Sequence, residues 1–159
     1  MTKPNLDNAV IVLDMDGVLN KFDFGELQFK IVQDHEWAEL TMLKDTYYFV
    51  RKTCIFDSLI ESKSQSDLYV LSAALTSYEQ NSKIAFLNRE YPKINKDNVI
   101  FVGDAKFKID ILKGLRKILD KTGKEHMDLV MIEDTVSVLS DITKLNDDRI
   151  KCYLLSDFV

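Results

Sequence analysis

Residues 9–17 of the chain read Ala9-Val10-Ile11-Val12-Leu13-Asp14-Met15-Asp16-Gly17, an apolar run that ends in two aspartates and a glycine. Short runs of aliphatic, often β-branched residues are typical of strands that are buried on both faces of a parallel sheet. Gly17 permits a sharp turn, which we expect to bring Asp16 back to the side of Asp14. The stretch therefore predicts a buried strand with two carboxyl groups at its carboxyl end.

The same pattern returns along the chain. Further apolar runs lie at Leu68–Leu71, Val99–Val102, Leu129–Ile132 and, more weakly, Cys152–Leu155. Between these runs, apolar residues recur at the three- or four-residue spacing of a helix: Ile84/Leu87/Tyr91, Ile109/Leu112/Leu115 and Val136/Leu139/Ile142. The segment Tyr47–Ser62 is interpreted as the helix before the second strand. Thr76 and Ser77 both fit the cap spacing for the helix after the second strand, and Thr135 is the expected N-cap of the helix after Asp134. Alternation of strand and helix predicts an α/β fold, a three-layer α/β/α sandwich around a parallel, Rossmann-like sheet.

One segment breaks this alternation. Residues 20–46 follow the first strand and are rich in aromatic and charged side chains, so we expect a small cap-like insertion in a single domain of residues 1–159. Its aromatic residues are Phe22, Phe24, Phe29 and Trp37. Two interpretations stay open, because these rings either pack the insertion together or form a lid that stacks on the base of a substrate.

Composition limits the classes of partner. The chain has 21 basic and 26 acidic residues, a formal charge of −5, which disfavours general binding to nucleic-acid backbones. The run Ala9–Leu13 is far too short for a signal sequence or a membrane span, so we expect a cytoplasmic protein without a membrane partner. Cys54 and Cys152 show no metal-type spacing, which favours buried, reduced thiols.

Polar residues gather where the predicted strands end. Asp14 and Asp16 follow the first strand, Ser72 follows the second, and Glu133 with Asp134 follows the fourth. Ligands of open parallel sheets bind beyond this edge. A carboxylate there can act as a nucleophile toward phosphorus, and a second carboxyl can transfer protons. Simpler interpretations are an acidic turn at Asp14, a serine that bonds its own backbone, and acidic residues at a helix N-terminus.

In sequence, Asp14-Met15-Asp16-Gly17-Val18-Leu19 resembles the first motif of the haloacid dehalogenase-like phosphohydrolase superfamily. Ser72, a lysine-bearing helix and Glu133-Asp134 follow in the order of the other motifs. The resemblance implies that Asp14 is the nucleophile, that Asp16 is the general acid and base, and that Ser72 donates to a phosphoryl oxygen. The amides of Ala73 and Ala74 are expected to assist Ser72.

The resemblance also implies Mg²⁺ as the cofactor. Asp14 and Asp134 would bind the ion through their side chains, Asp16 through its backbone carbonyl, and Glu133 directly or through a water. The charges point the same way, because several carboxylates beside a phosphate need a cation, and hard oxygen ligands suit Mg²⁺.

The motif lysine has three candidates. Lys108 opens a predicted helix and precedes Glu133 by a spacing common in the superfamily, so it is the favoured residue. Lys106 resembles the placement in deoxyribonucleotidase-like members, and Lys113 that in polynucleotide 3′-phosphatase-like members.

Together these features predict a Mg²⁺-dependent phosphomonoester hydrolase that forms an aspartyl-phosphate. The alternatives are a phosphomutase or phosphotransferase of the same fold and a non-catalytic module that binds a phosphorylated ligand. The expected partner is a small phosphorylated substrate. The stretch Ser82-Lys83-Ile84-Ala85-Phe86-Leu87 resembles 5′(3′)-deoxyribonucleotidase-like members, which favours a nucleotide.

Overall fold

A parallel sheet forms the centre of the molecule. The computed structural model describes residues 4–22, 34–42 and 46–159. Within those residues the sheet has five strands in the order β3-β2-β1-β4-β5, and every pair of neighbours is parallel. The strands are β1 (Ala9–Leu13), β2 (Leu68–Ala73), β3 (Val99–Val102), β4 (Asp128–Glu133) and β5 (Ile150–Leu154). The predicted α/β fold class is confirmed.

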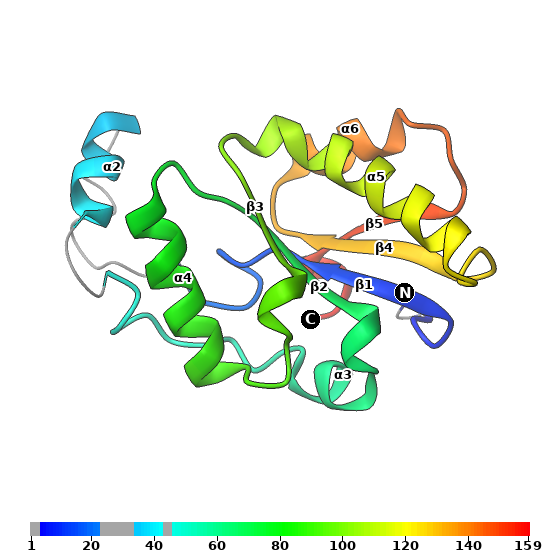
Figure 1. The fold of residues 1–159 in the computed structure, drawn as a ribbon, viewed down its shortest axis with the longest axis horizontal. Helices are drawn as coiled ribbons and strands as arrows, with labels where there is room; N and C mark the ends of the chain where they lie inside the picture. The colour runs from blue at the N-terminus through cyan, green and yellow to red at the C-terminus, as the bar shows by residue number, and fades with distance from the viewer. Residues whose placement is uncertain (1–3, 23–33, 43–45) are drawn as a thin grey trace.

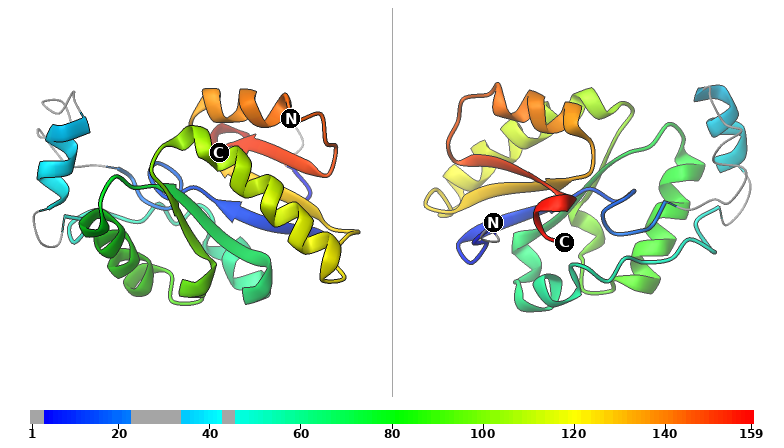
Figure 2. Two further views of the ribbon diagram at one scale, coloured as in Figure 1. Left: turned by 45° about the horizontal axis from the view of Figure 1, so that its top comes forward. Right: turned by 180° about the vertical axis from the view of Figure 1, so that it is seen from behind.

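Helices cover both faces of the sheet (Figures 1 and 2). They are α2 (Asp34–Thr41), α3 (Asp57–Ser62), α4 (Ser77–Glu90), α5 (Lys108–Lys121) and α6 (Val136–Thr143). Helices α3 and α4 lie against one face, whereas α5 and α6 lie against the other, which gives the expected three layers. Helix α2, from the predicted insertion, lies beside α4 at the margin of the sandwich.

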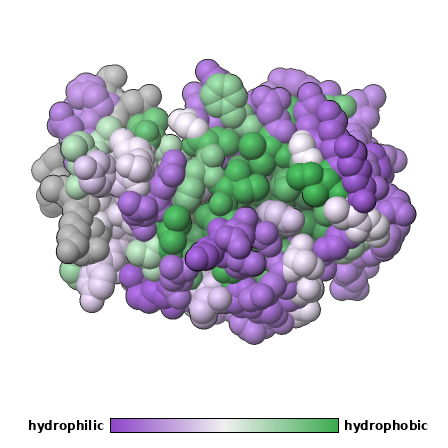
Figure 3. All heavy atoms as spheres, viewed as in Figure 1, coloured by the Kyte–Doolittle hydropathy of each residue, from purple (hydrophilic) through white to green (hydrophobic). Residues whose placement is uncertain are grey.

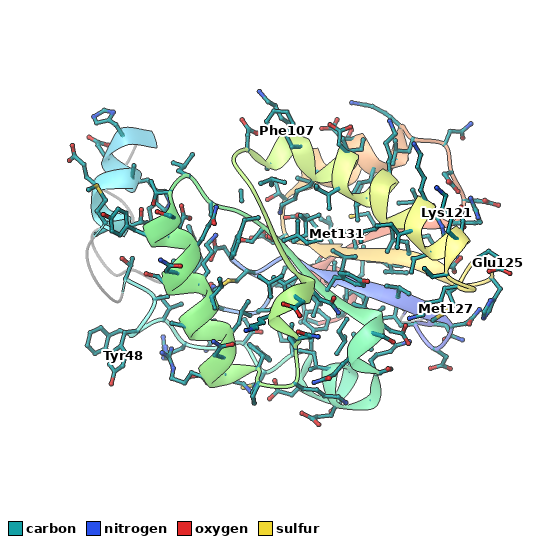
Figure 4. All side chains as sticks on the ribbon, in the orientation of Figure 1. Tyr48, Phe107, Lys121, Glu125, Met127 and Met131 are labelled. Atoms are coloured by element: carbon teal, nitrogen blue, oxygen red, sulfur yellow. The ribbon has the colours of Figure 1, made fainter. Side chains whose placement is uncertain are left out.

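Alternate residues of the strands supply two hydrophobic cores. Ile11 and Leu13 of β1 pack into the cluster beneath α3 and α4, while Val10 and Val12 join the cluster beneath α5 and α6. Successive side chains of a strand point to opposite faces, so an unbroken apolar run serves both layers. Figure 4 shows Met131 of β4 in the layer between the sheet and α5, where it is fully buried.

One edge of the sheet is apolar. Strand β3 pairs only with β2 in the described sheet, and its Val99, Ile100 and Phe101 are half-buried. Figure 3 shows a hydrophobic area in the middle of this face, where Figure 1 places β3 between α4 and α5. No helix in the described part of the chain is long and apolar enough to cross a membrane.

The predicted helix at Tyr47–Ser62 is wrong over most of its length. Only Asp57–Ser62 is helical. The preceding backbone pairs instead with the loop after β1: the Lys21 amide donates to the Arg51 carbonyl at 2.9 Å, and the Thr53 amide donates to the Leu19 carbonyl at 3.0 Å. Cys54 then adopts a positive φ of 63°, which is incompatible with a right-handed helix.

The prediction of two buried thiols is also half wrong. Cys54 is exposed, because it lies in this irregular segment, and Cys152 of β5 is partly buried. Burial raises the pKa of the Cys152 thiol to about 12, so this group stays neutral near pH 7.

The two predicted helix caps have different outcomes. The Thr76 hydroxyl oxygen accepts a hydrogen bond from the Glu79 amide at 3.2 Å, so Thr76 caps α4, whereas Ser77 is the first residue of the helix. Thr135 stands at the N-cap position of α6 but makes no side-chain cap. Its hydroxyl instead donates to the neighbouring Asp134 Oδ1 at 3.1 Å.

Candidate active site

Three carboxyl groups meet where β1 and β4 end. Asp14 follows β1, while Glu133 ends β4 and Asp134 follows it; one carboxylate oxygen from each lies within 4.8 Å of the others. Asp14 and Glu133 are buried, and Asp134 is exposed. Strands β1 and β4 are direct neighbours in the sheet, so their carboxyl ends bring these residues together. The geometry fits a cation site with hard oxygen donors.

Lys108 joins this acidic cluster. Its Nζ lies 2.8 Å from Asp14 Oδ1 and 2.7 Å from Glu133 Oε2, and the whole residue is buried. The first turn of α5 carries Lys108 over the ends of the strands. Of the other candidate lysines, Lys106 and Lys113 are exposed to solvent. Lys108 is therefore the lysine that the fold brings to Asp14.

Burial changes the acidity of the cluster. Desolvation raises the pKa of Asp14 to about 8; the Lys108 charge opposes this increase only in part, and the Glu133 charge adds to it. Burial also raises the pKa of Asp134. In the absence of a bound cation, the fold thus favours the protonated form of Asp14.

Glu133 is held on both sides. Its Oε2 accepts from Lys108, and its Oε1 accepts from the amides of Asp134 at 3.2 Å and Thr135 at 3.3 Å. These contacts fix the turn between β4 and α6. Glu133 therefore orients both Lys108 and the backbone of Asp134.

Gly17 provides the space for the Asp134 carboxylate. Gly17 has a φ of +81°, and a Cβ atom added there would lie 2.0 Å from Asp134 Oδ2. The turn that the sequence predicts after Asp16 is present, and it also forms a cradle for a residue from a different strand.

Gly17→Ala tests this close approach. We expect the variant to displace the Asp134 carboxylate and to lose about 1–2 kcal/mol of folding stability from the left-handed backbone. Thermal unfolding with and without Mg²⁺ measures both effects, and Gly114→Ala, where an added Cβ meets nothing within 4 Å, is the control. Unchanged Mg²⁺ binding in Gly17→Ala would contradict the proposed role of the cradle.

A second polar cluster contains Asp16, Ser72 and a lysine that the sequence analysis missed. Lys83 of α4 is fully buried, and its Nζ lies 2.7 Å from Asp16 Oδ2, 2.9 Å from Ser72 Oγ and 2.6 Å from the Ala73 carbonyl oxygen. Its position offered a signal: Lys83 shares the buried face of α4 with Phe86 and Leu87. A lysine on an apolar helix face requires a partner of opposite charge.

Other donors complete the surroundings of Asp16. Asn20 Nδ2 donates to Asp16 Oδ1 at 2.9 Å, and the Tyr47 hydroxyl donates to Asp16 Oδ2 at 3.2 Å. Burial and the neighbouring Asp16 charge raise the pKa of Tyr47 well above its usual value, so Tyr47 remains a neutral donor. The Asp16 carboxyl is thereby held in one orientation.

The loop after β2 differs from expectation. The Ala74 amide donates to the Val102 carbonyl at 2.8 Å, so it is not free to assist Ser72 as predicted. The next amide, of Leu75, donates to Glu79 Oε2 at 2.8 Å. The Ala74 amide is occupied because the pairing between β2 and β3 continues past the end of β2, and the Leu75 amide is occupied by the buried Glu79.

A cavity of about 360 Å³ opens beside Asp16. It lies between the insertion and the loops after β2 and β3, and its lining includes Phe22, Trp37, Leu75, Glu79 and Asp104. The Phe22 and Trp37 rings lie 5.7 Å apart, so they pack on each other and also face the cavity. Phe24 and Phe29 lie outside the described residues.

Another hollow, of about 670 Å³, lies between α6 and β5 and contains none of the predicted site residues. The strand-end site therefore rests on its chemistry and not on the size of its cavity.

Comparison of the chain with models of known protein families gives no match, and comparison with curated proteins gives none either.

Proposed function

We propose that this protein is a Mg²⁺-dependent phosphomonoester hydrolase of the haloacid dehalogenase-like superfamily. The observation that carries the proposal is the contact of Asp14 with Lys108, beside the carboxyl groups of Glu133 and Asp134. Near this cluster, Lys83 donates hydrogen bonds to both Asp16 and Ser72. In this proposal Asp14 is the nucleophile, Asp16 carries the proton and Ser72 donates to the phosphoryl group, and all three residues lie at the carboxyl ends of β1 and β2.

In the proposed reaction Asp14 attacks phosphorus with a carboxylate oxygen, and the bond from phosphorus to the ester oxygen breaks. Asp16 gives its proton to the departing oxygen. A water then attacks the aspartyl-phosphate, Asp16 accepts a proton from that water, and the bond from Asp14 to phosphorus breaks to release phosphate. Lys108 and the Ser72 hydroxyl stabilise the charge on the phosphoryl oxygens.

The donor set suits Mg²⁺. Asp14 and Asp134 would bind the ion through carboxylate oxygens and Asp16 through its backbone carbonyl. Glu133, whose oxygens already accept hydrogen bonds, would reach the ion through a water. When bound, Mg²⁺ supplies positive charge that offsets the carboxylates and the phosphate. The Gly17 cradle, which admits the Asp134 carboxylate, supports this assignment.

The test is phosphate release from p-nitrophenyl phosphate with Mg²⁺ and with EDTA. We expect release with Mg²⁺ only. Transfer of phosphate to a sugar without net release would favour the phosphomutase or phosphotransferase alternative. Binding of a phosphorylated ligand without either reaction would favour a non-catalytic module.

For the substrate we propose a nucleoside monophosphate, because Phe22 and Trp37 line the cavity beside Asp16. Stacking of a base on an aromatic ring contributes about 1–3 kcal/mol. Trp37→Ala should therefore lower kcat/KM about 10-fold or more for a deoxynucleoside monophosphate and leave a hexose phosphate unchanged.

Trp37→Phe is the matched variant, since it keeps a ring but removes the indole N–H that donates to Glu79. It should retain most of the preference for the nucleotide. A preference for the hexose phosphate in the wild type would reject the nucleotide while leaving hydrolysis in place.

A further inference from the structure

We infer that Lys83 is a positioning residue that holds Asp16 and Ser72 in register and links both, through Glu79, to Trp37 of helix α2. The inference rests on the proposed hydrolysis for the roles of Asp16 and Ser72. The chain of contacts from Lys83 to Trp37 stands on the structure alone.

Lys83 is fully buried, so its positive charge must be compensated by the groups around it. Its ammonium group donates to Asp16, Ser72 and the Ala73 carbonyl. Its Nζ also lies 3.4 Å from Glu79 Oε1. Removal of one partner from a buried ion pair leaves an uncompensated charge. Lys83 therefore fixes the distance between the strand that carries Ser72 and the turn that carries Asp16.

The contact with Ser72 determines the direction of its hydroxyl. Because Lys83 donates to Ser72 Oγ, the serine oxygen acts as an acceptor on that side and its own hydrogen points elsewhere. That hydrogen makes only a long bond of 3.5 Å to the Ala73 carbonyl oxygen, which a phosphoryl oxygen can replace. Lys83 thus prepares both groups that would meet the substrate without meeting it itself.

Glu79 extends this arrangement to the insertion. The Trp37 indole donates to Glu79 Oε1 at 3.0 Å, while Glu79 Oε2 accepts from the Leu75 amide. Glu79 is itself buried, so one carboxylate joins α2, the loop after β2 and Lys83. Displacement of α2 would remove the indole donor of Trp37 from Glu79. The Glu79 carboxylate would then attract the Lys83 ammonium group more strongly and weaken the contact of Lys83 with Asp16.

The first arm of the test is the dependence on the leaving group. In Lys83→Met, kcat/KM should fall about 100-fold for an alkyl phosphate, which needs protonation by Asp16, and only a few-fold for p-nitrophenyl phosphate. Lys113→Met, at an exposed position of α5, should change neither value. Equal losses for both substrates would mean that Lys83 is merely structural and would overturn the positioning role.

The second arm needs no turnover, because Trp37 is the only tryptophan of the chain. Lys83→Met should shift the fluorescence emission of Trp37 to longer wavelength, and Glu79→Gln, which keeps Lys83, should do the same. Lys113→Met should not. Unchanged emission in both variants would overturn the link to α2. A wild type that hydrolyses neither substrate would reject the proposed function, and the emission would still decide whether Lys83 and α2 are linked.

Discussion

Asp14→Asn is expected to lower kcat by about 10⁴-fold or more, because removal of a catalytic nucleophile leaves only the remaining binding groups. The amide has nearly the shape of the carboxyl group but cannot form an aspartyl-phosphate. Lys108 keeps Glu133 as a partner at 2.7 Å, so we expect the variant to fold. Phosphate release with Mg²⁺ and thermal unfolding measure the two outcomes.

Asp110→Asn is the matched control. Asp110 lies in the first turn of the same helix as Lys108 but is exposed, and it should keep wild-type activity. In the wild type, rapid quenching with acid should trap phosphate on the protein, and Asp14→Asn should trap none. Appreciable turnover by a folded Asp14→Asn protein would exclude Asp14 as the nucleophile.

The ends of the strands were predictable because the sequence repeats one pattern, a short apolar run followed by polar residues. Each apolar run that is followed by polar residues became a strand of the parallel sheet, so Asp14, Ser72 and Glu133 could be placed at one edge before any geometry was known. The choice of Lys108 over Lys106 followed from its place at the start of a predicted helix and from its spacing to Glu133, which resembles that of the superfamily. The helix orientation that brings Lys108 onto Asp14 is a property of packing between α5 and the sheet.

Other parts of the site depend on contacts between distant segments. Tyr47 reaches Asp16 only because the residues before α3 pair with the loop after β1, which is a tertiary effect that overrides the helical pattern. The sequence pattern marks Lys83 only by its place beside Phe86 and Leu87 and does not single out Glu79. Their roles emerge because the face of α4 that carries them is buried against the ends of β1 and β2.

Metal removal provides the second large effect. EDTA should abolish phosphate release and Mg²⁺ should restore it. The acidic groups of Asp14, Glu133 and Asp134 lie close together, and the single positive charge of Lys108 cannot neutralise all three of them. Asp134→Asn should weaken Mg²⁺ binding by more than about 100-fold. Removal of a residue that only hydrogen-bonds a metal ligand lowers the affinity for the metal by about 10–100-fold, and removal of a direct ligand should lower it further. Asp110→Asn again serves as the control.

The pH dependence of Mg²⁺ stabilisation tests the same site without turnover. The pKa of Asp14 rises from 3.8 to about 8 on burial, so the metal-free fold holds a proton that the unfolded chain releases. Metal-free stability should therefore fall as the pH increases from about 4 through 8. In the proposed site Mg²⁺ would bind the ionised carboxylate and compete with that proton, so the gain in melting temperature on adding Mg²⁺ should grow between about pH 6 and pH 9. Asp14→Asn and Asp134→Asn should each remove most of this growth. A gain that is independent of pH, or that persists in both variants, would place Mg²⁺ elsewhere on the protein and leave the buried Asp14 carboxyl without its proposed partner.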